Sequence, residues 1–175
     1  MDFFQVIRDR RSIRRYKGIP VEQEKVEKIL NAARMAPSWK NMQCWRFLVV
    51  REQPKRTNIL DALSENNPGR NAIATAPIVI LVCADTAKSG VSNEISYYIA
   101  DAATAFAHLC LAAHSLGLGT CWMGSYDEGK IKQLFSLPDR IRIVGITPLG
   151  YPDQRPNPRP RKELSEIVFY DEWPP

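Results

Sequence analysis

The sequence predicts a protein in which α-helices and β-strands combine in one ordinary domain of 175 residues. Apolar residues recur at helical spacing over residues 21–35, which predicts an amphipathic helix. An alanine-rich stretch over residues 94–116 is apolar nearly all round, which is typical of a long helix buried in the domain or against a partner subunit. Residues 77–83 form an uninterrupted apolar run, which favours a central strand covered on both faces.

Shorter patterns predict the remaining elements. Residues 2–9, 55–63 and 128–135 have the composition of short helices, and residues 45–50 and 141–147 that of strands. Ser92 or Asn93 is expected to cap the long helix at its start, and Gly117 at its end. Residues 166–170 have strand composition after a proline-rich arm, so we expect them to pair with a sheet edge, that of their own chain or that of a partner. No repeat or second domain is visible, and we expect one domain over residues 1–175.

Composition narrows the class of protein. Hydrophobic residues make up 45% and charged residues 25%, as in soluble globular proteins, and the formal net charge is +5. The four cysteines form no CxxC pair, which predicts reduced thiols in an intracellular, cytoplasmic protein. His108 and His114 lie far from any Asp/Cys cluster, so we expect core or interface histidines and no metal site. We expect neither a signal peptide nor a membrane span, because the apolar stretches are too short or too interrupted.

Positive charge is concentrated near both ends of the chain. The segment Arg10–Tyr16 holds four arginines and one serine, and a second basic cluster follows at Arg159–Lys162. A guanidinium group stays charged and offers a planar fork that matches phosphate oxygens. A single basic run is usually a solvated turn, but a compact fold that joined the two clusters would surround one phosphate. Such a patch suits a phosphate-bearing cofactor as well as nucleic acid.

Two loops carry the other candidate residues. The polar loop Pro37–Gln43 holds a hydroxyl, two amides and Trp39 between a helix and a strand. Amides donate and accept hydrogen bonds, so this loop fits the edge of a heterocycle and an ordinary capped turn equally well. In the second loop, the glycines at positions 117, 119 and 124 let the backbone pass close to something flat or bulky. No helix starts where a phosphate-binding GxGxxG motif would require one.

Taken in order, these stretches resemble the nitroreductase family of flavoproteins over almost the whole chain. Each motif alone is weak, and their order and spacing carry the resemblance. The matching stretches are Arg10–Arg14, Ala36–Ser38 with Asn41 and Gln43, the strand that Trp45 begins, Gly117–Trp122, Leu134 with Leu137-Pro138, Leu149–Pro152 and Arg159–Arg161. Three features depart from the family pattern. Trp39 replaces a smaller residue, Cys44 replaces a proline, and residues 85–93 leave little room for the helical excursion of longer members.

The resemblance implies an α+β fold, with a mixed, mainly antiparallel sheet flanked by helices, and an intertwined homodimer with FMN at the subunit interface. The implied contacts to the FMN phosphate, ribityl chain and pyrimidine edge are Arg10, Ser12, Arg14, Arg159 and Arg161, to which we add Arg11. The partner subunit would line the ring with Pro37, Ser38, Trp39 and Asn41, with Gln43 nearby. Met123 and Gly124 would present backbone to the reactive edge of the flavin. We expect no catalytic acid or base from the protein.

The resemblance also implies a function. NADH or NADPH would reduce the flavin, which would then reduce an electron-poor acceptor such as a nitroaromatic or a quinone. Reduction builds negative charge on the pyrimidine side, and we expect Arg14 to stabilise it. Two alternatives are a flavin-binding protein without turnover and a basic nucleic-acid-binding domain without a cofactor. The second lacks a recognisable binding motif.

Overall fold

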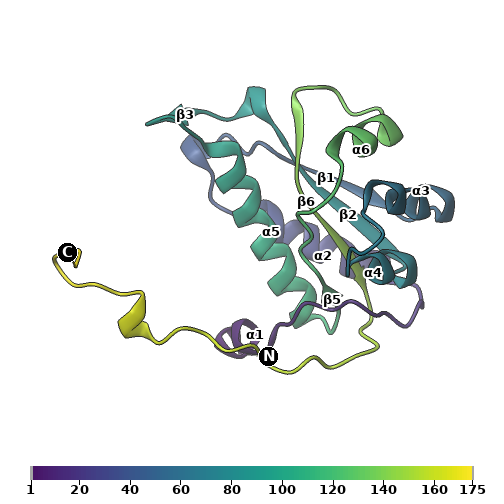
Figure 1. The fold of residues 1–175 in the computed structure, drawn as a ribbon, viewed down its shortest axis with the longest axis horizontal. Coiled ribbons are helices and arrows are strands. Elements are labelled where there is room, and N and C mark those ends of the chain that lie inside the picture. The colour runs from purple at the N-terminus through teal and green to yellow at the C-terminus, as the bar shows by residue number, and fades with distance from the viewer. Residues whose placement is uncertain (1, 175) are drawn as a thin grey trace.

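The computed structural model describes residues 2–174 and is built around a four-stranded sheet with strand order β1-β2-β6-β5 (Figure 1). Its strands are β1 (Trp45–Val50), β2 (Ile78–Asp85), β5 (Gly119–Thr120) and β6 (Ile141–Gly150). All three strand pairs are antiparallel, and one isolated parallel bridge joins Ser12 to Thr120. The expected mixed, mainly antiparallel sheet is therefore confirmed.

Helices cover both faces of the sheet (Figure 1). One face carries α2 (Gln23–Arg34) and α5 (Tyr97–Ser115), and the other carries α4 (Arg70–Thr75), α6 (Glu128–Phe135) and the short helix η2 (Ile59–Ala62). Every residue of β2 is buried, with Ile80 and Val82 facing α2 and α5 while Leu81 and Cys83 face the other side. Because successive side chains of a strand point to opposite faces, a strand between two cores must be apolar throughout. This arrangement confirms the central strand that the sequence predicts.

The long helix α5 ends as the sequence predicts but begins later. Gly117 follows it with φ of +77°, a left-handed conformation that glycine adopts without strain, and its amide donates to the His114 carbonyl. At the other end, β3 (Val91–Ser92) and β4 (Ile95–Ser96) form a hairpin, so the N-cap is Ser96 rather than Ser92 or Asn93.

The shorter helices lie close to their predicted positions. The first is α1 (Phe3–Asp9), and the predicted helix over residues 55–63 is divided into α3 (Gln53–Asn58) and η2. The remaining short helices are η1 (Trp39–Asn41), η3 (Thr86–Lys88) and η4 (Leu164–Glu166). No pattern predicted α4 (Arg70–Thr75), a helix of 6 residues that follows residues 66–69.

The C-terminal segment does not form the strand expected at residues 166–170. Just after β6, the amide of Lys17 donates to the Tyr151 carbonyl and that of Asp153 to the Arg15 carbonyl, so the segment starts beside residues 15–17. It then continues as an arm that leads away from the sheet (Figure 1), with η4 followed by turns and bends. Pairing with this chain's own sheet is therefore wrong, since strand composition yields a strand only where a free edge lies within reach. Pairing with a partner stays a prediction.

Candidate functional site

The arginine segment runs in an extended conformation along the edge of the sheet. The backbone amide of Ile13 donates to the Thr120 carbonyl at 2.8 Å, and the side-chain amide of Asn71 donates to the Arg14 carbonyl at 3.1 Å. Ile13 and Tyr16 are buried and anchor the segment. Since side chains alternate along an extended chain, even-numbered and odd-numbered residues face opposite sides. Arg10, Ser12 and Arg14 accordingly share one side, and Arg11 lies on the other.

A glycine makes this attachment possible. A Cβ atom at Gly119 would lie 2.6 Å from Cγ1 of Ile13 and 2.8 Å from its Cβ. Real Cβ atoms do not approach other heavy atoms so closely, so any larger residue at position 119 would push Ile13 away from β5. The absence of a side chain at Gly119 therefore allows the arginine segment to lie close to β5.

A first cavity, of about 310 Å³, brings together three predicted site residues: Arg14, Met123 and Gly124. The backbone of Met123 is fixed by two hydrogen bonds to Ile146 on β6. Arg14 is exposed, and in the described part of the chain its guanidinium group donates no hydrogen bond. The cavity therefore combines a free cation with a rigid backbone edge.

The same cavity contains residues that the sequence analysis missed. Asn66, Asn67 and Gly69 line it together with Arg14. The side-chain amide of Asn67 donates to the Ser125 carbonyl at 2.9 Å, and its side-chain oxygen accepts from the Gly69 amide at 2.8 Å. Asn67 therefore connects the turn before α4 to the segment that follows Gly124. We predicted no functional role for residues 66–69, although their pair of amides is the signal that marked the loop Pro37–Gln43.

In the folded chain, the loop Pro37–Gln43 lies far from the arginine segment. The Trp39 amide donates to Oδ1 of Asp101 at 2.9 Å, and Asp101 belongs to the first half of α5. The arginine segment lies beside β5, which follows Gly117 at the other end of this helix. The helix from Asp101 to Gly117 is roughly 24 Å long at about 1.5 Å per residue. One chain therefore does not bring Pro37, Ser38, Trp39, Asn41 and Gln43 to the arginines.

The backbone of this loop is strained. Lys40, Asn41 and Gln43 have φ angles of 47°, 55° and 50°, in the left-handed region that residues other than glycine seldom adopt. Ser38 Oγ accepts the Gln43 amide at 2.9 Å, and the Gln43 side-chain amide donates to the Asn41 side-chain oxygen at 3.1 Å. Clustered strain of this kind is typical of binding and catalytic sites, where the surrounding structure holds polar groups in position.

Asp101 is the buried support of this loop. Besides the Trp39 amide, its carboxylate accepts the Ser89 hydroxyl at 3.5 Å and the Cys44 thiol at 3.7 Å. Burial, together with the charge of Asp101, raises the pKa of Cys44 to about 11, so the thiol keeps the proton that it donates at neutral pH. The ring of Trp39 packs on Gly90, where any Cβ would collide with it, and lies 6.0 Å from the Tyr97 ring.

Replacing Asp101 tests this support. Asp101→Leu leaves the Trp39 amide without its acceptor, so we expect a loss of about 1–3 kcal/mol in the free energy of unfolding and faster exchange of that amide. Asp101→Asn keeps an acceptor oxygen and should cost less. Urea unfolding and hydrogen exchange measure both effects, with Ser115→Ala on the same helix as control. Unchanged exchange at Trp39 in the leucine variant would contradict the role of Asp101.

The second basic cluster lies on the C-terminal arm. Arg159 and Arg161 are exposed, and Arg161 donates only to the carbonyls of Arg159 and Pro160 within the described residues. The cavity that Arg14 lines contains neither Arg159 nor Arg161. The structure therefore leaves these arginines available to an anion without itself joining the two clusters.

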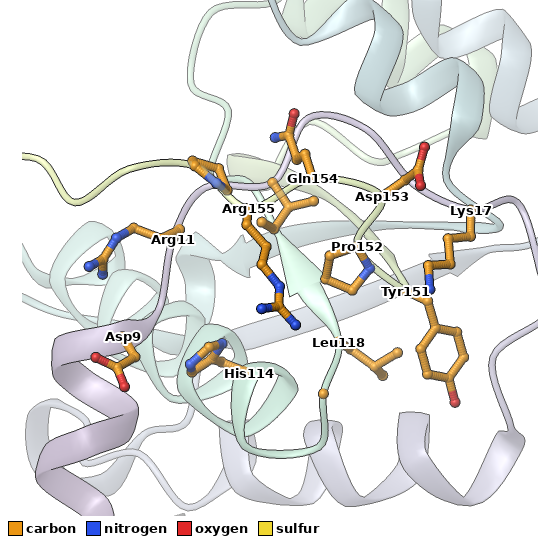
Figure 2. A pocket seen from close by; sticks show the side chains of 13 residues that line it. Asp9, Arg11, Lys17, His114, Leu118, Tyr151, Pro152, Asp153, Gln154 and Arg155 are labelled. Atoms are coloured by element: carbon orange, nitrogen blue, oxygen red, sulfur yellow. The ribbon is translucent and has the colours of Figure 1, made fainter.

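Arg11 lines a second cavity, of about 810 Å³, that shares no residue with the first. His114 and Arg155 also line it (Figure 2). No group of three or more His, Cys, Asp or Glu side chains suited to a metal ion occurs in residues 2–174. Within the same residues, no helix has the length and apolar character that crossing a membrane requires.

Comparison with known proteins gives consistent matches. The model of the Nitroreductase family matches residues 7–73 and 65–151. A protein of Methanothermobacter thermautotrophicus with the provisional name NADH dehydrogenase/NAD(P)H nitroreductase is 37% identical, over 91% of this chain and 82% of its own length. The FMN reductase [NAD(P)H] of Bacillus subtilis is 29% identical, over 87% of this chain and 67% of its own. A crystal structure of a nitroreductase family protein from Clostridium difficile 630 superposes with a TM-score of 0.88 at 32% identity, over 99% of this chain and 100% of its own.

Proposed function

Since this chain belongs to the nitroreductase family, we propose that it is an FMN-dependent NAD(P)H oxidoreductase whose flavin site is shared by two copies of the chain. One copy supplies the arginine segment, the 310 Å³ cavity and the arm, and the other supplies the loop Pro37–Gln43. The observation that carries this proposal is the separation of these two half-sites by most of the length of α5 in a single chain.

The residues present fit FMN. Its phosphate carries close to two negative charges and requires several charge-assisted hydrogen bonds to offset lost hydration. Arg10 and Arg14 face one side of the arginine segment and, within the described residues, donate no side-chain hydrogen bond. Ser12 adds a hydroxyl on the same side, and Arg159 and Arg161 supply further exposed cations from the arm. Arg11 faces the other way, so we leave it out of the proposed flavin contacts.

The ring end of the cofactor suits the 310 Å³ cavity. Arg14 places a cation there, and the backbone of Met123, next to Gly124, is held by β6. When bound, FMN supplies the capacity to accept a hydride from a nicotinamide and to pass electrons to an acceptor. A cation beside the pyrimidine edge favours the more negative, reduced state, which is the role we assign to Arg14. The other residues of the site would bind and orient the cofactor and exclude water from it.

A homodimer explains the exposed apolar side chains as well. Phe3 and Phe4 on α1 are 62% and 75% exposed, and the arm exposes Leu164 and Tyr170 by 73% and 84%. Exposed apolar groups of this size mark protein interfaces. The C-terminal arm leads away from the sheet of its own chain and carries such groups, which fits an intertwined dimer (Figure 1).

The acceptor is a small planar, electron-poor molecule such as a nitroaromatic or a quinone. Trp39 bounds the second half-site, and Gly90, Tyr97 and Asp101 hold its ring and amide in place. A rigid indole both narrows the space for an acceptor and offers a flat face on which an aromatic ring can stack. NADH or NADPH and this acceptor use the same slot in turn, in a two-step exchange.

A spectroscopic experiment tests the proposal. The purified protein should be a yellow dimer that absorbs near ~450 nm, and mixing with NADH or NADPH in a stopped-flow instrument should bleach it. A quinone or nitroaromatic added afterwards should restore the colour. A yellow protein that neither nucleotide bleaches would instead indicate a flavin-binding protein without turnover, and a colourless monomer would overturn the proposal.

A further inference from the structure

The second cavity lies under the start of the C-terminal arm. Its walls come from the end of α1, from the arginine segment, from the end of α5 and from residues 151–156 (Figure 2). Its volume of about 810 Å³ is in the range of small-molecule sites. Ile13, Leu118 and Pro152 give it apolar surface beside its charged groups.

Two buried polar atoms without partners belong to residues that line this cavity. In residues 2–174, the buried side-chain nitrogens and oxygens that lack a hydrogen-bond partner are Nε of Arg11 and Nε2 of His114. Buried donors are normally satisfied, because an unpaired one loses its hydration without compensation. Both atoms belong to residues of the same cavity, so the polar groups of this cavity are incompletely satisfied within the described chain.

The charges of the cavity favour an anion. Arg11, Lys17 and Arg155 supply three cations, and Figure 2 shows Arg155 reaching from the arm toward His114. The two acids are already engaged, since Asp9 pairs with Arg8 at 3.0 Å and Asp153 with Arg15 at 3.5 Å. Within the described residues, the side chains of Lys17 and Arg155 form no ion pair. The cavity therefore holds more free positive than negative charge.

We propose that this cavity binds a small phosphate-bearing molecule, at a site separate from the flavin. The phosphate oxygens pair with the cations Arg11, Lys17 and Arg155 beside His114, which Arg155 approaches from the arm. A phosphate group fits because its oxygens accept several donors at once and because guanidinium groups match their geometry. The apolar wall leaves room for an organic group attached to the phosphate.

The arrangement of the arginine segment separates this site from the flavin site. Arg11 and Ile13 face this cavity, whereas Arg14 faces the other, and buried Ile13 with Gly119 lies between them. The binding experiment below involves no flavin reduction, so its result is independent of whether the chain turns over nicotinamides.

Histidine NMR tests the proposal with inorganic phosphate as the probe. The chain has only two histidines, so the imidazole signals of the full-length, flavin-loaded protein in a phosphate-free buffer are readily assigned with a His114→Gln variant. Burial and the charges of Arg10 and Arg11 lower the pKa of His114, against the opposing effect of Asp9. Bound phosphate adds negative charge beside these groups and the cations Lys17 and Arg155, so it should raise the pKa of His114.

We expect phosphate to shift the His114 signals saturably while His108 stays unchanged. Arg11→Gln and Arg155→Gln should each weaken binding about tenfold, since each removes a charged hydrogen-bond donor. Arg155→Gln removes no internal hydrogen bond of the described chain, so it stays informative if Arg11→Gln fails to fold. Arg51→Gln, at the far end of β1, changes the charge equally and should have no effect.

Three results would overturn the proposal. His114 signals that respond no more than those of His108 would mean that phosphate does not bind beside His114. Equal weakening by Arg51→Gln and Arg155→Gln would reduce the effect to net charge. Finally, the sample can be passed through an ultrafiltration membrane after the phosphate titration. If phosphate binding releases FMN into the filtrate, the cavity is part of the flavin site.

Discussion

Gly119→Ala is expected to detach the arginine segment from the sheet and to cost about 3 kcal/mol in the free energy of unfolding. The added Cβ would lie 2.6 Å from Ile13 Cγ1, and Ile13 cannot yield without breaking the hydrogen bond from its amide to the Thr120 carbonyl. Because Arg10, Ser12 and Arg14 are carried by the same segment, flavin retention should fall together with stability.

A double-mutant cycle isolates this contact. Combining Gly119→Ala with Ile13→Gly removes the clashing side chain, so the two changes together should cost less than the sum of their separate costs. Gly124→Ala is the stability control, since a Cβ there meets no atom within 4 Å. Denaturant unfolding gives the free energies, and strictly additive costs would contradict the proposed role of Gly119.

Arg10→Ala and Arg161→Ala should each lower FMN affinity by at least about tenfold, because each leaves a buried phosphate short of one charged donor. Arg10→Lys should recover only part of the loss, since an ammonium group keeps the charge but not the planar fork. Arg34→Ala, an exposed arginine on α2, serves as control. Flavin content after gel filtration measures the effect, and wild-type content in both alanine variants would remove the phosphate assignment.

Local signals in the sequence were sufficient for most of the fold. The strand at residues 45–50 and the helix at residues 128–135 have their predicted bounds, because apolar periodicity and flanking turns define both. The strand expected at residues 166–170 is absent, since pairing depends on an edge that the local sequence does not encode. The hairpin at residues 91–96 was also missed, because its strands have only two residues each.

The candidate site was predictable in its residue types and not in its geometry. Arg14, Met123 and Gly124 do line one cavity, although 109 positions separate the first two in the sequence (123 − 14). The orientation of Arg11 depends on the register of the segment against Thr120, which requires the bridge of Ser12 to β5. The role of Asp101 likewise depends on a contact with Trp39 across the fold. Such long-range contacts leave no local pattern.

A complementation experiment tests the shared site most directly. One chain carries Arg10→Ala and Arg14→Ala, the other carries Ser38→Ala and Asn41→Ala, and different affinity tags allow the mixed dimer to be isolated. A site built from two chains predicts that each variant alone retains little FMN, while the mixed dimer regains one intact site and about half of the wild-type flavin content. A mixed dimer with no more flavin than the pure variants would contradict a site shared between two copies.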